Sequence, residues 1–256
     1  MSKCPICDSA TIATLFRQLN VWRCTRCGMR FRNPQPSEEE LARFYDSAFR
    51  PENVVTNKTV MAGTTEDLAR QYVSHLEDKI GISRKKVLEF GAGLGITCQA
   101  LRNMGANVTA IDPFAWRECA KSGVPTYRSL AELPQDAKDL VLSLEVVEHV
   151  RAPLTIFREL QNRLLPGGWL YVATPNAASL RARLYGSRWK ELTKYGHLLF
   201  YTPDTLELAL KQSGFPICAR VKNPVRYAKN PGKTLAHYVL QFAGLDGELR
   251  YLAQAT

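Results

Sequence analysis

The sequence predicts a mixed α/β fold, in which helices cover both faces of a parallel sheet, preceded by a small metal-binding unit. The first observation is that residues 85–112 read as a strand, a glycine-rich loop, a helix and a second strand. The remaining observation is a pair of CxxC motifs near the N-terminus.

The composition is that of a globular protein. Of the 256 residues, 45% are hydrophobic and 23% are charged, which excludes disordered and collagen-like chains. No stretch reaches the roughly 18 uninterrupted apolar residues of a membrane-spanning helix, and the N-terminus lacks the apolar segment of a signal peptide. We therefore predict a cytoplasmic protein, with binding at the periphery of a membrane as the alternative.

The charge is strongly basic, with a net value of +10. The excess lies in two regions: residues 1–33 hold six Lys or Arg against one Asp, and residues 178–233 hold eleven against three acidic residues. Such a field favours anionic partners, which include phosphate-bearing metabolites, RNA and anionic membrane surfaces.

Two CxxC motifs separated by sixteen residues predict a zinc ribbon over residues 1–33. The four ligands are Cys4, Cys7, Cys24 and Cys27. Four thiolates close the coordination sphere of zinc, so we expect a structural ion, with a short hairpin between the two motifs. The scattered arginines of this unit are expected either to hold phosphates or to form solvated surface.

Two helices are expected between the ribbon and the first strand of the sheet. Residues 34–62 read as a linker with a bridging helix, because Ser37 and three glutamates that follow it are typical of a helix start. Apolar residues at helical spacing predict a second helix over residues 65–80. The main domain is therefore assigned to residues 63–256.

The glycine-rich loop Gly91-Ala92-Gly93-Leu94-Gly95 predicts a cofactor site. It lies between a strand and a helix, and Asp112 follows at the end of the next strand. Glycines let the backbone approach a ligand closely, and a carboxylate at that strand end suits a ribose diol. An adenosine-containing cofactor is therefore indicated.

The segment Val87-Leu-Glu-Phe-Gly-Ala-Gly-Leu-Gly95 resembles the first motif of class I S-adenosylmethionine-dependent methyltransferases. Residues 139–144 and 164–176 resemble the fourth and fifth strands of that family, in the same order. The resemblance is closest to the branch with the ubiquinone-biosynthesis O-methyltransferases, and it implies a Rossmann-like class I methyltransferase sheet. The chain lacks the GxGxxG of dinucleotide-binding dehydrogenases.

The same resemblance implies the residues that bind S-adenosylmethionine. Glu89 and the backbone of Gly91 to Gly93 would hold the methionine end, and Asp112 the ribose hydroxyls. For Asp112, capping of a helix is the competing interpretation. The complete set of cofactor-binding residues is Glu89, Gly91, Ala92, Gly93, Gly95, Asp112, Pro113, Phe114, Ser129, Leu130 and Leu144.

Directly after residues 139–144 come Glu145, Glu148 and His149, which would share one face of a helix if a helix begins there. With the distant His197, this ExxEH pattern resembles the metal site of small-RNA 3′-terminal 2′-O-methyltransferases and a matching pattern in the ubiquinone O-methyltransferases. The resemblance implies a catalytic divalent cation, such as Mg²⁺, that binds two adjacent oxygens of the acceptor. In the alternative, the two carboxylates complement a helix N-terminus and His149 acts alone as a general base.

Residues 177–202, which we call the basic lid, predict an amphipathic helix pair in which basic and aromatic residues alternate. The lid would recognise an anionic acceptor, lie on an anionic membrane, or simply cover the core. A sixth strand is expected over residues 215–221, then a basic loop after Pro224 and a helix from about Lys233, with no seventh strand.

We therefore expect a methyltransferase that modifies a hydroxyl of a small or carrier-linked acceptor, with sugar and phenolic hydroxyls as the leading candidates. Three alternatives stay open at this point. They are a sugar C-methyltransferase, an RNA-end 2′-O-methyltransferase and a non-catalytic scaffold that uses the zinc ribbon to hold a partner.

Overall fold

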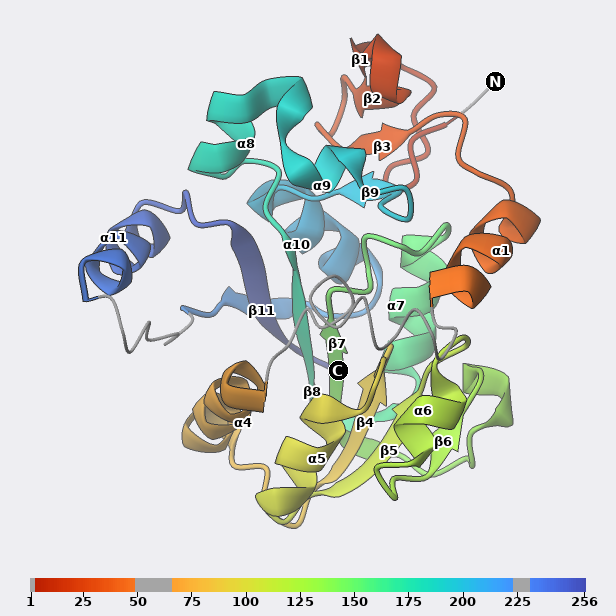
Figure 1. Cartoon of the computed structure of the whole chain (residues 1–256), viewed down its shortest axis with the longest axis vertical. Helices are drawn as coiled ribbons and strands as arrows, with labels where there is room; N and C mark the ends of the chain where they lie inside the picture. Colours follow the sequence, from red (N-terminus) through yellow and green to blue (C-terminus); the bar gives the residue numbers. More distant parts are fainter. Residues whose placement is uncertain (1–2, 49–65, 223–230) are drawn as a thin grey trace.

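The computed structural model describes residues 3–48, 66–222 and 231–256. A sheet of seven strands in the order β10-β11-β8-β7-β4-β5-β6 forms its centre (Figure 1). The strands are β4 (Lys86–Phe90), β5 (Asn107–Ile111), β6 (Thr126–Tyr127), β7 (Lys138–Leu144), β8 (Leu164–Pro175), β10 (Ile217–Arg220) and β11 (Glu248–Gln254). Neighbouring strands pair in parallel except at β11, which runs antiparallel to both β8 and β10.

Helices cover both faces of this sheet, as the sequence predicts. On one face, α4 (Glu66–Ile80) and α5 (Ile96–Asn103) bury Val73, Leu76 and Leu101 in one core cluster. On the other, α7 (Pro153–Gln161) and α10 (Pro203–Gln212) bury residues such as Phe157 and Leu206. The Rossmann-like prediction for the sheet is therefore confirmed.

The prediction that no seventh strand exists is wrong. β11 lies between β8 and β10 and pairs with β8 over seven residues, from Glu248 opposite Pro175 to Gln254 opposite Trp169. It follows α11 (Pro231–Phe242). The strand holds the charged Arg250, which hides its hydrophobic pattern, yet Arg250 is buried against Tyr72 and Glu248. The basic loop expected after Pro224 lies outside the described residues.

The N-terminal unit, residues 3–33, is a hairpin followed by a third strand. β1 (Ile12–Phe16) pairs with β2 (Val21–Cys24), and β2 pairs with β3 (Arg30–Arg32). A fourth strand, β9 (Leu199–Phe200), comes from the end of the basic lid and pairs with β3. The N-terminal unit is thus joined to the rest of the chain by a shared sheet (Figure 1).

The bridging helix and the basic lid flank the same end of the large sheet. α1 (Glu38–Ala48) begins at Ser37, whose hydroxyl accepts from Glu40 N while Glu40 accepts from Ser37 N, a capping box. Residues 49–62 of the expected linker and the domain start at residue 63 lie outside the described residues. The lid forms two short helices, α8 (Leu180–Tyr185) and α9 (Lys190–Thr193), as expected.

Candidate active site

The glycine loop leaves β4 in a conformation that requires glycine. Gly91 has φ 80°, and a Cβ there would lie 2.3 Å from Cγ2 of Val146. Gly93 has φ 53°, and among the described residues no atom lies within 4 Å of the position of its missing Cβ. Because this stretch of backbone borders open space, a ligand can approach it closely. Gly95, with φ 77°, then starts α5.

Asp112 follows β5 and orders the turn around the glycine loop. Its Oδ2 accepts a hydrogen bond from Gly93 N at 2.9 Å, and its Oδ1 accepts from Phe114 N and Ala115 N. Burial raises the pKa of this carboxyl, and the three N–H groups oppose that rise. Asp112 therefore orders the turn over residues 113–115, whereas the helix that follows, α6 (Trp116–Ala120), begins after Ala115 without a side-chain cap. A carboxylate has about four lone-pair sites, so three N–H partners still leave it able to accept from a ligand.

Glu89 lies within β4 with its carboxyl buried beneath the loop. Its Oε2 accepts from the Cys98 thiol at 2.8 Å. Burial raises the pKa of Glu89 to about 8, against the lowering effect of the Cys98 hydrogen bond. A buried carboxyl without a cationic partner is costly to ionise, so this group is suited to a positively charged ligand.

The other residues expected at the cofactor come from several segments of the chain. Phe114 stacks on Tyr45 of α1 with 4.7 Å between ring centroids, and Ser129 precedes a short helix that begins with the buried Leu130. The remaining members are Ala92 in the loop, Pro113 after Asp112, and Leu144 at the end of β7.

The prediction that Glu145, Glu148 and His149 share one face of a helix is wrong. The chain turns after β7 instead, and α7 begins only at Pro153. Glu145 itself has φ 55°, a left-handed conformation that is uncommon outside glycine and is concentrated at functional sites. Burial and the neighbouring carboxylates of Glu148 and Glu191 raise its pKa well above the usual range.

The turn brings together three of the four residues expected at the catalytic face. Glu148, His149 and His197 each offer a ligand atom, and these atoms lie within 4.8 Å of one another. Glu145 does not belong to this group. Leu198 N and Leu199 N both donate to the carbonyl of Glu148, which fixes the lid segment beside the turn. The convergence therefore depends on the tertiary fold and not on a helical repeat.

The protonation of His149 follows from its partners. Its Nδ1 lies 2.8 Å from the carbonyl oxygen of Gly196, which can only accept, so Nδ1 carries the proton. The hydroxyl of Tyr45 also lies 2.7 Å from Nδ1. Burial lowers the pKa of His149 to about 4. Nε2 is therefore unprotonated near neutral pH, and it lies 3.8 Å from Oε1 of Glu148.

Glu148 and His197 each present a buried polar atom without a hydrogen-bond partner among the described residues. For Glu148 it is Oε1, since Oε2 accepts from Thr174 Oγ1 at 2.8 Å. For His197 it is Nδ1, which lies 3.5 Å from Glu191. Burial raises the pKa of Glu148 to about 7 and lowers that of His197 to about 2. Two neutral imidazoles and a carboxyl oxygen without a partner form a donor set that fits a divalent cation.

Arg32 of β3 holds the lid segment that carries His197. Its guanidinium donates to the carbonyl oxygens of His197 at 2.7 Å, Leu192 at 2.8 Å and Lys194 at 3.1 Å. A fourth bond, to Leu19 at 2.9 Å, ties it to the N-terminal unit. This role was not predictable from the sequence, because the backbone carbonyls that Arg32 contacts leave no residue-type pattern.

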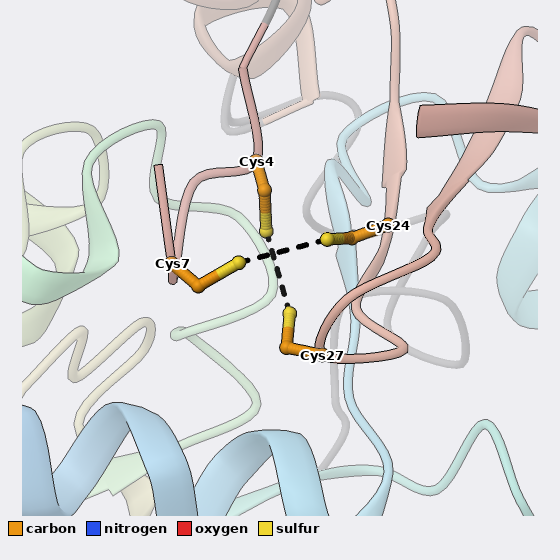
Figure 2. A group of neighbouring side chains, drawn as sticks. All are labelled: Cys4, Cys7, Cys24 and Cys27. Carbon is orange, nitrogen blue, oxygen red and sulfur yellow. Dashed lines mark hydrogen bonds between the residues drawn. The ribbon is translucent and has the colours of Figure 1, made fainter. Parts of the chain in front are cut away.

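The four N-terminal cysteines converge in space (Figure 2). Sγ of Cys4 lies 3.5 Å from that of Cys27, and Sγ of Cys7 lies 3.6 Å from that of Cys24. A zinc ion with four thiolates at about 2.3 Å would separate neighbouring sulfurs by about 3.8 Å. Burial raises the pKa of Cys4 and Cys27, whereas at Cys24 the N–H groups of Cys27 and Arg26, together with neighbouring thiols, outweigh burial and lower the pKa to about 7. The sulfur atoms and these N–H groups thus fit a metal knuckle.

A cavity of about 230 Å³ opens beside Glu145. Carboxylates line it from three elements, namely Glu145 after β7, Glu191 of α9 and Glu248 of β11. Tyr72 of α4 closes one wall and donates from its hydroxyl to Glu248. The space next to the candidate catalytic residues is therefore acidic, although the lid as a whole is basic.

Residues 61–219 match a family model described as a methyltransferase domain. Two curated relatives are ubiquinone biosynthesis O-methyltransferases. The one from Dinoroseobacter shibae is 30% identical over 183 residues, which cover 65% of this chain and 73% of the relative. The one from Pseudomonas aeruginosa is 34% identical over 116 residues, and this chain spans about half of its length, while 41% of this chain is covered.

Solved structures resemble the fold over nearly the whole chain. The 1,6-didemethyltoxoflavin-N1-methyltransferase of Burkholderia thailandensis, with 1,6-didemethyltoxoflavin and S-adenosylhomocysteine bound, has a TM-score of 0.59 at 18% identity, covering 96% of this chain and all of its own. Magnesium protoporphyrin IX methyltransferase of Synechocystis, with S-adenosylhomocysteine bound, also scores 0.59, at 13% identity over 84% of this chain and 99% of its own. In the described part of this chain, helices are too short or too polar to cross a bilayer.

Proposed function

This chain belongs to the methyltransferase-domain family, and from that premise we propose that it transfers a methyl group from S-adenosylmethionine to a hydroxyl oxygen of a small or carrier-linked acceptor. Sugar and phenolic hydroxyls are the leading acceptors. The observation that carries the proposal is the convergence of Glu148, His149 and His197 at the carboxyl end of the sheet, beside the glycine loop. Ligands of open α/β sheets bind at that end.

The residues around the loop fit the cofactor. S-adenosylmethionine supplies an electrophilic methyl group on a sulfonium sulfur. The open space beside Gly93 accommodates a ligand against the backbone, Asp112 can accept from ribose hydroxyls, and Glu89 can pair with the ammonium group. The stacked pair of Tyr45 and Phe114 supplies an aromatic wall beside them.

Glu148, His149 and His197 would activate the acceptor. The unprotonated Nε2 of His149 can accept the proton of a hydroxyl, because Gly196 holds the ring with Nδ1 protonated. The same three groups fit a divalent cation such as Mg²⁺, which lowers the pKa of a hydroxyl and fixes its orientation. Thr174 and Arg32 position Glu148 and the His197 segment for either role.

The test is transfer of labelled methyl from S-adenosylmethionine into a cell extract separated into sugar-nucleotide, phenolic, lipid and RNA fractions, each with and without EDTA. We expect label in the sugar-nucleotide or phenolic fraction. Loss of that label with EDTA supports the cation, whereas EDTA-resistant label supports His149 as the base. Label confined to RNA would contradict the proposed acceptor class, and protein that binds no cofactor would contradict the proposed activity.

Cofactor binding should release a proton near pH 7. Because burial raises the pKa of Glu89 to about 8, most of this carboxyl is neutral in the free protein at pH 7, and an ammonium group favours its ionised form. Affinity should therefore rise between pH 6 and 8. Glu89→Gln should weaken binding about 10- to 100-fold, the value of a charged hydrogen bond, and remove this part of the proton release. Calorimetry in buffers of different ionisation enthalpy measures both.

Comparing Glu89→Gln with the unmodified chain cancels any titration of the cofactor itself. Equal proton release by the two proteins would contradict the role of Glu89.

We also propose that Cys4, Cys7, Cys24 and Cys27 bind one structural zinc ion. Metal analysis should find about one zinc per chain, the expectation for a single four-thiolate site. Cys24→Ser should lose the zinc and lower Tm, whereas Cys218→Ser, at a half-buried cysteine outside the cluster, should retain it. Four thiols that react at once with a thiol reagent in untreated protein would contradict the zinc site.

A further inference from the structure

A second cavity, of about 480 Å³, lies where the N-terminal unit meets the rest of the chain. Four segments line it: the second cysteine motif with its flanking strands, the start of the basic lid, the first turn of α10, and the turn after α11. This volume is in the range of small-molecule sites. None of the candidate catalytic residues lines this cavity.

The charge in this cavity is strongly positive. Arg23, Arg26, Arg30 and Arg183 line it, against the single carboxylate of Asp204. Within the described residues, none of these four arginines forms an ion pair with a carboxylate. Paired or solvated arginines are ordinary, but four that share one cavity without acidic partners indicate an anionic ligand.

Two of these arginines oppose each other directly. Arg23 and Arg30 are partners across the antiparallel pair β2–β3, a placement at which like charges destabilise a sheet. Burial lowers the pKa of Arg30, and the positive charges of Arg23 and Arg183 lower it further. An anion between the three side chains would remove this repulsion.

The guanidinium groups of Arg30 and Arg183 each donate a hydrogen bond to the lid and keep further donors for a ligand. Arg30 donates from Nη1 to the carbonyl of Ala177 at 2.8 Å, and Arg183 donates from Nε to that of Ala178 at 3.0 Å. Nε of Arg30 is buried and has no hydrogen-bond partner among the described residues. The donors left over form forks of the kind that bind phosphate oxygens.

We propose that this cavity binds the phosphate or diphosphate group of the acceptor's carrier. The inference rests on the proposed function, because it places the anionic part of a carrier-linked acceptor away from the reacting hydroxyl. The cavity beside Glu145 is lined by three carboxylates that would repel such a group. Both cavities touch the basic lid, so an anion at Arg30 and Arg183 would contact the segment that carries His197.

Calorimetric titration with inorganic pyrophosphate at low salt tests the site. Arg30→Gln and Arg183→Gln should each weaken binding at least about tenfold, the loss of one charge-assisted contact. Arg17→Gln removes an exposed arginine of the same unit outside the cavity, so it should bind as the unmodified chain does. Pyrophosphate should also raise Tm in the unmodified chain more than in Arg183→Gln, an exposed position whose replacement leaves the fold intact.

Two further titrations distinguish the source of the group. Uridine diphosphate represents a soluble carrier, and phosphatidylcholine vesicles that carry farnesyl diphosphate represent a lipid carrier. Binding in either titration that weakens in both cavity variants supports the site. No binding of pyrophosphate, or equal binding by all four proteins, would overturn it. Affinity for S-adenosylmethionine, measured on the same samples, shows separately whether the proposed function holds.

Discussion

Replacing His149 with alanine should lower kcat for methyl transfer by about 10³-fold, within the range that a positioned general base contributes. The side chain presents the unprotonated Nε2 to the site, and both interpretations of the cluster, as base or as cation ligand, require it. Affinity for S-adenosylmethionine should not change, because the residues proposed to bind the cofactor are Glu89 and the glycine loop. Steady-state kinetics together with calorimetric cofactor binding measure the two effects.

The matched control is His75→Ala, which removes a histidine of α4 away from the cluster and should leave kcat within a few-fold. Glu148→Gln then distinguishes the two interpretations. This variant should lower kcat at least about 10²-fold if Glu148 binds a cation, and only a few-fold if His149 acts alone. A His149→Ala enzyme with unchanged kcat would contradict both interpretations.

Replacing Arg32 with alanine should impair stability and turnover together. The guanidinium donates to four carbonyl oxygens, and their loss should lower the free energy of unfolding by about 3 kcal/mol, given the value of hydrogen bonds to charged groups. The lid segment would also lose its anchor, so kcat should fall about 10- to 100-fold through displacement of His197. Urea unfolding and kinetics measure the two quantities.

Arg32→Lys separates the charge from the geometry, because an ammonium group cannot reach four carbonyls in one plane. It should resemble the alanine variant in kcat, while Arg17→Ala at an exposed position should resemble the unmodified chain. Normal kcat in a folded Arg32→Ala protein would show that the N-terminal unit does not position the site.

Local features of the site were predictable from the sequence. The spacing of the cysteines predicted their convergence, and the glycine loop with Asp112 was placed between strand and helix as expected. These features depend on contacts within short segments, where residue type and spacing reflect geometry directly. The order of strand, glycine loop, helix and strand over residues 85–112, together with the resemblance of residues 139–144 and 164–176 to the methyltransferase strands, predicted the large sheet.

Features that depend on distant contacts were not predictable. The backbone of Glu145 adopts a left-handed conformation in the turn after β7. A glutamate does not indicate such a turn in the sequence, so a helix was expected there. Tyr45 reaches His149 from 104 residues away, and Arg32 binds carbonyls of the lid. Strand β11 was not predicted, because it contains the charged Arg250, which is buried in the structure. In each case a tertiary partner reverses what the local sequence favours.

The most direct test of the central claim is the nuclear magnetic resonance spectrum of the product formed with S-adenosylmethionine that carries a carbon-13 methyl group. We predict that the labelled methyl appears at the chemical shift of a methoxy group, and that the signal is lost with His149→Ala. A labelled methyl at the shift of a C-methyl or N-methyl group, or one that persists unchanged in the variant, would contradict methyl transfer to oxygen at the cluster of Glu148, His149 and His197.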